Sequence, residues 1–260
     1  MIPKVRAWLD TQGYLLEMRT ASAFRAAGFD VRQSSHYVDP ETGKSREVDV
    51  IALDPDVVGI INISFIVECK SSNKPWVLLC SPDTLDGYNR IFAFSVVSDK
   101  ARKALAGRMS QLLDRIPWLR KSGLIGYSVR QALSDADIAY AAAVSAAKAC
   151  DVLTHGVASS YKPYAFAFPV IVIGGPLIRC SLAENGDVQL EEVEEGEFLF
   201  AAYLPKYFGT CIRVVTSARL TAFAVEAKRV ADHIRAEFKS EEDEVRESWR
   251  DDVVGSKNQP

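Results

Sequence analysis

The 260-residue sequence predicts an α/β fold with a mixed central sheet flanked by helices. Three patterns lead to this prediction: an amphipathic segment at residues 13–27 that precedes several extended segments, an alanine-rich helical segment at 134–155, and a return to strand-like alternation after residue 166. The composition, with 48% hydrophobic and 25% charged residues, is typical of a globular protein. It excludes a fully disordered, collagen-like or low-complexity chain.

The first part of the chain predicts a helix followed by a β-meander. Apolar residues recur at helical spacing from Gly13 to Ala27, and Gly28 supplies a C-terminal stop. The run Asp39-Pro40-Glu41-Thr42-Gly43-Lys44 is a turn between the first two strands. The expected strands are 29–38, 47–53, 60–70 and 76–80. In the second of them, Val48, Val50 and Ala52 are expected to share one face.

The rest of the chain predicts two helical segments and then a strand-rich part. The helices are expected at 99–119 and at 134–155, the second with Ser134 as its N-cap. Strands are expected at 168–173, 177–182, 188–193, 198–203 and 211–216, before a long helix at 217–239. We therefore expect a core at residues 1–163, an antiparallel β-rich extension with a long terminal helix at 164–240, either separate from the core or continuous with it, and a charged flexible tail at 241–260.

Targeting and redox signals are weak. No segment resembles a signal peptide, and the longest apolar runs fall far short of the roughly 20 residues that span a membrane, so the expected location is the cytoplasm, with no membrane partner. The five cysteines are widely spaced and include no CxxC pair. Thiols are therefore expected rather than disulfides or a zinc site.

Charged residues interrupt two of the apolar strands. Asp49 lies in the middle of the second strand, and Glu68 and Lys70 close the third. Because strand side chains alternate, Glu68 and Lys70 point to one face and Cys69 to the other. Such charges among Val and Ile need compensation, and a hard divalent cation supplies it. Two carboxylates, a carbonyl and waters suit Mg²⁺, with Mn²⁺ as a substitute, and a lysine beside them suits phosphodiester hydrolysis.

These residues resemble the PD-(D/E)XK, or restriction-endonuclease-like, nuclease superfamily. The resemblance rests on Glu17 in the first helix, Asp49, and Glu68-x-Lys70, in the order helix, strand, strand, strand, with the helix at 134–155 as the crossover helix. It is closest to stand-alone bacterial members with a Gly-Tyr-Leu-Leu-Glu opening and Glu-Cys-Lys-Ser-Ser followed by Lys-Pro-Trp. It implies a restriction-endonuclease-like core, with Asp49 and Glu68 as metal ligands, Glu17 as a further ligand directly or through water, and Lys70 as the catalytic lysine. Val48 stands where the family pattern has proline.

The expected function is therefore that of a Mg²⁺-dependent DNA endonuclease, a hydrolase acting in restriction, anti-phage defence or DNA repair. A Glu-x-Lys triplet alone arises by chance about once in a chain of this composition, and its structural interpretation is a salt bridge at a sheet edge. One alternative is a catalytically silent nuclease-fold module with a binding or regulatory role. Another is a nuclease that acts only in an assembly, with a protein partner on the C-terminal part. Double-strand cleavage would require two active sites, as in a homodimer.

Candidate DNA contacts fall in two places. Ser71, Ser72 and Lys74 follow the third strand, where they either donate to a phosphate or form a polar turn. A stretch at 100–130 holds eight basic residues and one acid, Asp114; the basic residues are Lys100, Arg102, Lys103, Arg108, Arg115, Arg120, Lys121 and Arg130. The net charge of −3 does not argue against DNA, because residues 1–160 hold 19 basic and 17 acidic residues, and residues 161–260 hold 12 and 17.

Overall fold

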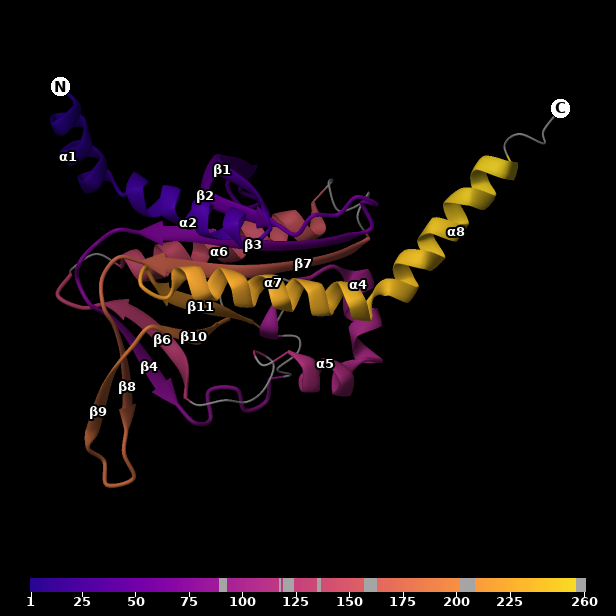
Figure 1. Cartoon of the computed structure of the whole chain (residues 1–260). Coiled ribbons are helices and arrows are strands. Elements are labelled where there is room, and N and C mark those ends of the chain that lie inside the picture. The colour runs from indigo at the N-terminus through magenta and orange to yellow at the C-terminus, as the bar shows by residue number, and fades with distance from the viewer. Residues whose placement is uncertain are drawn as a thin grey trace.

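The chain folds around one large mixed sheet. The computed structural model describes residues 1–88, 93–116, 118, 124–134, 137–156, 163–201 and 209–255. The strands described there form an 11-stranded sheet of order β1-β2-β3-β7-β11-β10-β6-β4-β8-β9, with β5 beside β7 (Figure 1). Their bounds are β1 Asp30–Val38, β2 Ser45–Leu53, β3 Ile61–Lys70, β4 Trp76–Ser81, β5 Val96–Val97, β6 Ile125–Gln131, β7 Tyr164–Ile173, β8 Leu177–Leu182, β9 Val188–Val193, β10 Glu195–Phe200 and β11 Thr210–Thr216.

Helices cover both faces of this sheet. The helices are α1 Ile2–Gln12, α2 Tyr14–Ala26, α4 Asp99–Ala106, α5 Met109–Arg115, α6 Ile138–His155, α7 Leu220–Glu237 and α8 Lys239–Gly255. Helices α2 and α7 pack on one face, and α6 packs on the other (Figure 1). The alanines of α6 let it lie close to the sheet, since Ala142, Ala143, Ala146 and Ala147 are all buried. The α/β class and the mixed sheet are as predicted.

The predicted meander forms the first part of the sheet. Strands β1, β2 and β3 pair antiparallel, and β3 then pairs parallel with β7 from Ile61↔Tyr164 to Lys70↔Ile173. Every residue of β7 is buried. This agrees with its apolar sequence, because a parallel strand covered on both faces needs no polar alternation.

The C-terminal strands join the same sheet in a way the sequence did not predict. We expected an antiparallel extension, but β7 is parallel to β3 and β11 is parallel to β7, whereas β10–β11 and β8–β9 are antiparallel. The expected boundary at residue 163/164 therefore falls at the start of a strand in the middle of the sheet. The segments before and after that position are joined by backbone hydrogen bonds, because β3 pairs with β7.

Strand β6 was not predicted. It lies between β4 and β10, and Gly126 within it lies so close to Phe198 that a Cβ atom would be 2.9 Å from the Phe198 Cβ. A glycine inside a short strand weakens the local signal for a strand. Here both neighbouring strands supply the pairing that the local sequence does not predict.

Several helix predictions need correction. The single helix expected at 99–119 is two helices, α4 and α5, separated at Gly107 and Arg108. The N-cap of α6 is Asp137 rather than Ser134, and its carboxylate accepts the Tyr140 N–H at 3.0 Å. Residues 2–12 form α1, which was not predicted. Residues 241–255, expected to be a flexible tail, belong to α8, which projects from the body (Figure 1).

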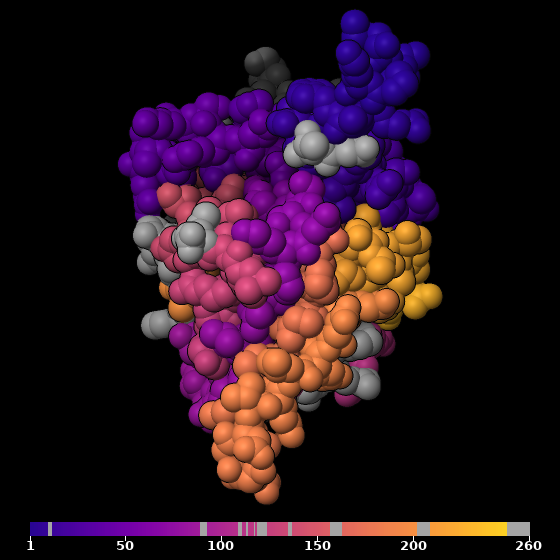
Figure 2. Space-filling view, turned by 90° about the vertical axis from the view of Figure 1, so that its left-hand side faces the viewer, coloured from indigo at the N-terminus to yellow at the C-terminus, as the bar shows by residue number. Residues whose placement is uncertain are grey.

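The edge of the sheet is a projecting hairpin. Strands β8 and β9 stand out of the body at the opposite end from α1 (Figure 2). Leu182, Val188 and Leu190 on this hairpin are exposed, and Arg179 of β8 bonds to Glu191 of β9 at 2.8 Å. The acidic sequence Glu191-Glu192-Val193-Glu194-Glu195 thus begins on this projecting edge strand.

Two further predictions concern membranes and thiols. No helix in the described part of the chain is both long and apolar enough to cross a membrane. None of the five cysteines forms a disulfide bond, and Cys80, Cys150 and Cys211 are buried, as expected of thiols in a folded core.

Candidate metal and phosphodiester site

Asp49 and Glu68 meet where strands β2 and β3 stop pairing. The backbone register of these strands runs from Leu53↔Ser64 to Val50↔Val67, and Asp49 and Glu68 are the next residues on each strand. Instead of continuing the ladder, the Asp49 carboxylate accepts the N–H of Cys69 at 2.7 Å. The side chain of Asp49 therefore takes the place of a backbone partner and is held against β3.

Lys70 lies between the two carboxylates. Its Nζ is 2.9 Å from Glu68 Oε2 and 3.8 Å from Asp49 Oδ2. The Glu68 side chain is 6% exposed, whereas those of Asp49 and Lys70 are 20% and 24% exposed. The group is thus closed on the Glu68 side and open to solvent at Asp49 and Lys70.

Alternation along β3 is as predicted. Glu68 contacts α6 on one face, and the Cys69 thiol lies 3.5 Å from the Thr20 hydroxyl of α2 on the other. The same expectation for β2 is wrong at Val48. Val50 and Ala52 pack on the α2 side, but Val48 packs with Ile51 on the α6 side. The face presented by β2 therefore changes at Asp49, where its pairing with β3 ends.

Helix α6 supplies a contact that sequence reasoning missed. Ser145 donates a hydrogen bond from its Oγ to Glu68 Oε1 at 2.8 Å, so both oxygens of Glu68 are engaged. The Tyr37 hydroxyl lies 3.5 Å from the Ser145 carbonyl oxygen. A lone serine in an alanine-rich helix was the only local signal, because the facing residue lies 77 positions earlier in the chain.

One turn further along α6, Lys148 fixes the turn between β1 and β2. This buried lysine is 3.2 Å from an Asp39 oxygen and 2.7 Å from a Glu41 oxygen. The β1–β2 turn, predicted from Asp39-Pro40, is thereby tied to the helix that carries Ser145. Glu68 is thus held by Lys70 of β3 and by Ser145 of α6.

Glu17 comes from α2 and is electrostatically linked to the pair. Partial burial raises its pKa, and the negative charges of Asp49 and Glu47 raise it further. The carboxylates of Glu17 on α2, Asp49 on β2 and Glu68 on β3 are thus near one another. Their mutual repulsion is the physical signature of a place where a cation would be stabilised.

The pKa shifts of Glu68 and Lys70 follow from burial and pairing. Burial raises the pKa of Glu68, and the nearby Lys70 charge only partly opposes this. Burial alone would lower the pKa of Lys70, but the charges of Glu68 and Asp49 outweigh it and the pKa rises. Lys70 is therefore a firmly protonated ammonium in this arrangement and acts as the cation of the group.

The donor set suits Mg²⁺ but is not a closed cage. Mg²⁺ is usually held by one or two carboxylates with several waters, and Asp49 and Glu68 supply two carboxylates next to a solvent-exposed opening. Within the described ranges, no group of three His, Cys, Asp or Glu side chains is placed to hold an ion. Glu17 therefore does not complete a three-ligand group here, and the fit to Mg²⁺ rests on Asp49 and Glu68.

The loop after β3 lies beside this group. Ser71 follows Lys70 directly and faces Gly13, where a Cβ atom would be 3.0 Å from the Ser71 Oγ. The Ser72 Oγ accepts the N–H of Lys74 at 3.2 Å, which favours the polar-turn interpretation for Ser72. Ser71 and Lys74 are exposed. Trp76, by contrast, is fully buried, as expected for a core aromatic.

Helix α4, at the start of the basic stretch, lies away from these residues. Lys100 lies over the ring of Tyr164 at the first residue of β7, whereas Lys70 pairs with Ile173 at its last, about 30 Å away at about 3.3 Å per residue. Arg102 and Lys103 belong to the same helix, α4. Arg108 and Arg115 bond to Glu241 and Glu237. Arg120 and Lys121 lie outside the described residues.

Comparisons with known proteins add no family assignment. No family model matches the sequence, no curated protein matches it, and no solved structure matches the fold. The function is therefore argued from the geometry of the site.

Proposed function

We propose that the protein is a metal-dependent nuclease that hydrolyses phosphodiester bonds in DNA with Mg²⁺ at Asp49 and Glu68. The observation that carries the proposal is the convergence of Asp49, Glu68 and Lys70 at the point where β2 and β3 separate. A bound Mg²⁺ would polarise a phosphate oxygen and lower the pKa of a water. Asp49 and Glu68 would hold it, and Lys70 would then be released from them to stabilise negative charge on the phosphate.

The order of elements supports the same interpretation. Helix α2, strands β1, β2 and β3, helix α6 and strand β7 follow one another with β7 parallel to β3. This is the order that the resemblance to restriction-endonuclease-like proteins implies, with the segment from Ser71 to Asp137 inserted before the crossover helix. Glu17 on α2 is then a further acidic group, acting through water.

A second function is favoured by one specific observation. Lys70 contacts both carboxylates, and no three-ligand group is formed among the described residues. A nuclease-fold protein that had lost its chemistry and served as a binding or regulatory module would keep such an internal ion pair. The two functions differ in whether a divalent cation displaces Lys70 from the carboxylates.

The deciding experiment is a cleavage assay on linear, circular and single-stranded DNA with Mg²⁺ or Mn²⁺. The wild type is expected to cut, and Asp49→Asn and Lys70→Met are expected to lose cutting while keeping their circular dichroism spectra. Arg32→Ala, an exposed residue on β1, is the matched control. Absence of metal binding in calorimetry, together with absence of cutting, would favour a regulatory role, and cutting that is unchanged in both variants would contradict the assignment of this site.

A further inference from the structure

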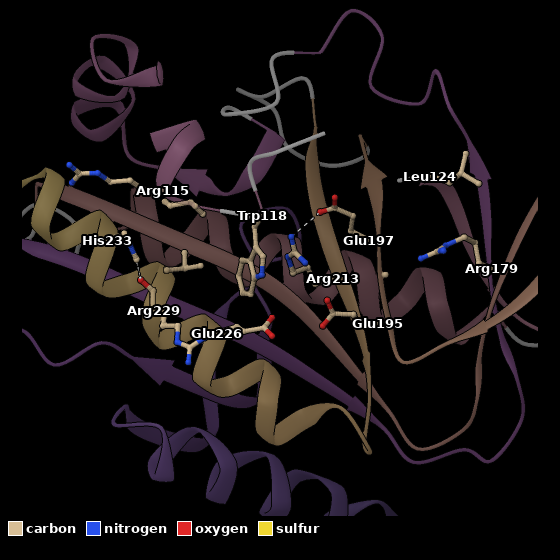
Figure 3. Close-up of a pocket in the computed structure, with 13 residues that line it drawn as sticks. Arg115, Trp118, Leu124, Arg179, Glu195, Glu197, Arg213, Glu226, Arg229 and His233 are labelled. Atoms are coloured by element: carbon tan, nitrogen blue, oxygen red, sulfur yellow. Dashed lines mark hydrogen bonds and ion pairs between the residues drawn. The ribbon is translucent and has the colours of Figure 1, made fainter. Parts of the chain in front are cut away.

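A cavity of about 550 Å³ lies beside α7, on the face of the sheet away from Ser145. Its walls come from α7, from β10 and β11, and from the side chains of Ile116 and Trp118 (Figure 3). We call it the α7 pocket. Its volume lies in the range of pockets that bind cofactors and small molecules, about 300–1,000 Å³.

A flat stack of side chains forms one wall of the α7 pocket. The rings of Trp118 and Phe223 are stacked at 5.2 Å with 9° between their planes. The Arg213 guanidinium carbon lies 4.0 Å from the centre of the Trp118 ring. Arg213 also lines the cavity and keeps 15% of its side chain exposed. A planar ring in the cavity can therefore lie against the guanidinium, as unpaired bases do on arginine.

The carboxylates in this wall are already neutralised. Glu197 pairs with Arg213 at 3.3 Å, and Glu195 pairs with Arg219 at 3.1 Å. Glu226 bonds to the same Arg219. These carboxylates do not repel an anion as isolated charges would, and their remaining lone pairs can accept hydrogen bonds from amino or hydroxyl groups of a ligand.

The Arg229 guanidinium at the other end of the pocket is not neutralised in this way. Arg229 and His233 lie one turn apart on α7, and both line the cavity (Figure 3). No ion pair joins either side chain to an acid in the part of the chain that the structure describes, and the His233 ring bonds to the Arg229 carbonyl. A guanidinium that no acid neutralises can bind one phosphate or carboxylate group.

A buried donor without a partner also belongs to this pocket. Arg179 lines the cavity, and its Nε is buried with no hydrogen-bond partner among the described residues. A buried N–H without a partner is destabilising. An acceptor group of a bound ligand would satisfy it.

We propose that the α7 pocket binds a nucleotide, with the base against Arg213 and the phosphate at Arg229. The stack accounts for a planar ring, the neutralised glutamates for amino and ribose hydroxyl groups, and the Arg229 guanidinium for the phosphate. The pocket uses none of the residues assigned to metal binding. Phe223, which stacks on Trp118 of the pocket wall, lies 6.3 Å from Phe24 of α2, the helix of Glu17.

The test is calorimetric titration of the full-length protein with AMP, GMP, CMP and UMP, and with ribose 5-phosphate and inorganic phosphate as separate probes. At least one nucleotide is expected to bind at one site per chain, and both base-free probes at least about tenfold more weakly. Arg229→Ala is expected to weaken the nucleotide by about 10–100-fold, as for a lost hydrogen bond to a charged group. Arg213→Lys keeps the charge but removes the flat surface, and is expected to weaken the nucleotide while leaving phosphate unchanged.

Controls separate this proposal from the proposed nuclease function. Arg32→Ala and Lys70→Met are expected to bind the nucleotide as the wild type does, because neither residue lines the pocket. The proposal is overturned if no nucleotide binds, if ribose 5-phosphate or phosphate binds as tightly as the nucleotides, or if both Arg229→Ala and Arg213→Lys bind like the wild type. Loss of DNA cleavage has no bearing on these outcomes, since the readout is binding.

Discussion

Ser145 of α6 donates a 2.8 Å hydrogen bond to Glu68 of β3, on the carboxylate oxygen that Lys70 leaves unpaired. Glu68 is therefore held by a helix on one side and by a neighbouring lysine on the other. A buried carboxylate with both oxygens engaged has one orientation, and this fixes where its charge points.

Ser145→Ala tests whether that orientation matters for the proposed chemistry. Removing the hydroxyl leaves one oxygen of Glu68 without a donor, and hydrogen bonds to charged groups contribute about 1.5–3 kcal/mol. We expect DNA cleavage to fall by about tenfold or more and the Mg²⁺ concentration for half-maximal rate to rise. Cleavage rates measured across a Mg²⁺ series would show both effects.

The matched control is Ser217→Ala, an exposed serine at the start of the loop before α7. It is expected to cleave as the wild type does. If Ser145→Ala lowers the rate at all Mg²⁺ concentrations by the same factor, with no shift in the Mg²⁺ dependence, Ser145 does not act through the metal ligand.

Lys70→Met removes the cation that Asp49 and Glu68 share. Breaking a buried pair by removing one partner costs about 3–5 kcal/mol. Because Lys70 is partly exposed, we expect a cost at the lower end of this range. We expect the melting temperature without divalent ions to fall by about 6–12 °C. Mg²⁺ is expected to raise it more in the variant than in the wild type, because the carboxylates are no longer occupied.

Thermal unfolding with and without Mg²⁺ measures this difference. Lys74→Met, which removes an exposed lysine four residues later in the chain, is expected to match the wild type in both conditions. Equal Mg²⁺ effects on Lys70→Met and the wild type would mean that the lysine and the metal do not compete for Asp49 and Glu68.

Glu17→Gln gives a pH-dependent change in stability. The folded-state pKa of Glu17 lies above its ordinary value of 4.5, because of burial and the charges of Asp49 and Glu47. A carboxyl group with a raised folded pKa lowers stability as pH rises through that pKa. The variant is therefore expected to be more stable than the wild type at about pH 7.5, by no more than about 2 °C in melting temperature because solvent screens the group.

The same comparison below about pH 4 should show no difference, since Glu17 is then protonated in both the folded and the unfolded states. Melting curves in metal-free buffer at the two pH values measure it. A variant that is less stable than the wild type at neutral pH would show that Glu17 is not repelled by its neighbours.

Lys148→Met tests the link between α6 and the β1–β2 turn. The variant leaves Asp39 buried with Arg46 at 3.6 Å as its remaining cation. We expect a loss in the free energy of unfolding, measured in urea, because Asp39 keeps its charge and loses one of its cationic partners. In the background of Asp39→Asn, the same change should cost much less, because the buried charge is gone; equal losses in both backgrounds would rule out this pairing as the cause.

Local patterns in the sequence predicted much of the framework. The meander β1–β3, the strands β8 and β9, the helices α2, α6 and α7, and the shared face of Glu68 and Lys70 all follow from apolar periodicity and turn residues. These features depend on residues a few positions apart. The same reasoning identified Asp49 as unusual, because a charge among β-branched residues needs a partner.

Other features depend on packing between distant segments. Strand β6 exists because β4 and β10 pair with it, and Val48 faces α6 because the pairing of β2 with β3 ends at Asp49. The sequence predicted DNA contacts along the basic stretch at 100–130. Helix packing instead places Lys100 at the end of β7 that is distant from Lys70, and it pairs Arg108 with Glu241. Periodicity carries no information on such distances.

The sequence by itself determined which residues bear the chemistry of the proposed site, since Asp49, Glu68 and Lys70 are conspicuous wherever the strands lie. Only the tertiary structure decided what surrounds them: Ser145 on Glu68, the ammonium of Lys70 between two carboxylates, and the α7 pocket on the opposite face. The physical reason is that side-chain direction along a strand is local, with a period of two residues, whereas contacts between layers are set by how the whole sheet and its helices pack.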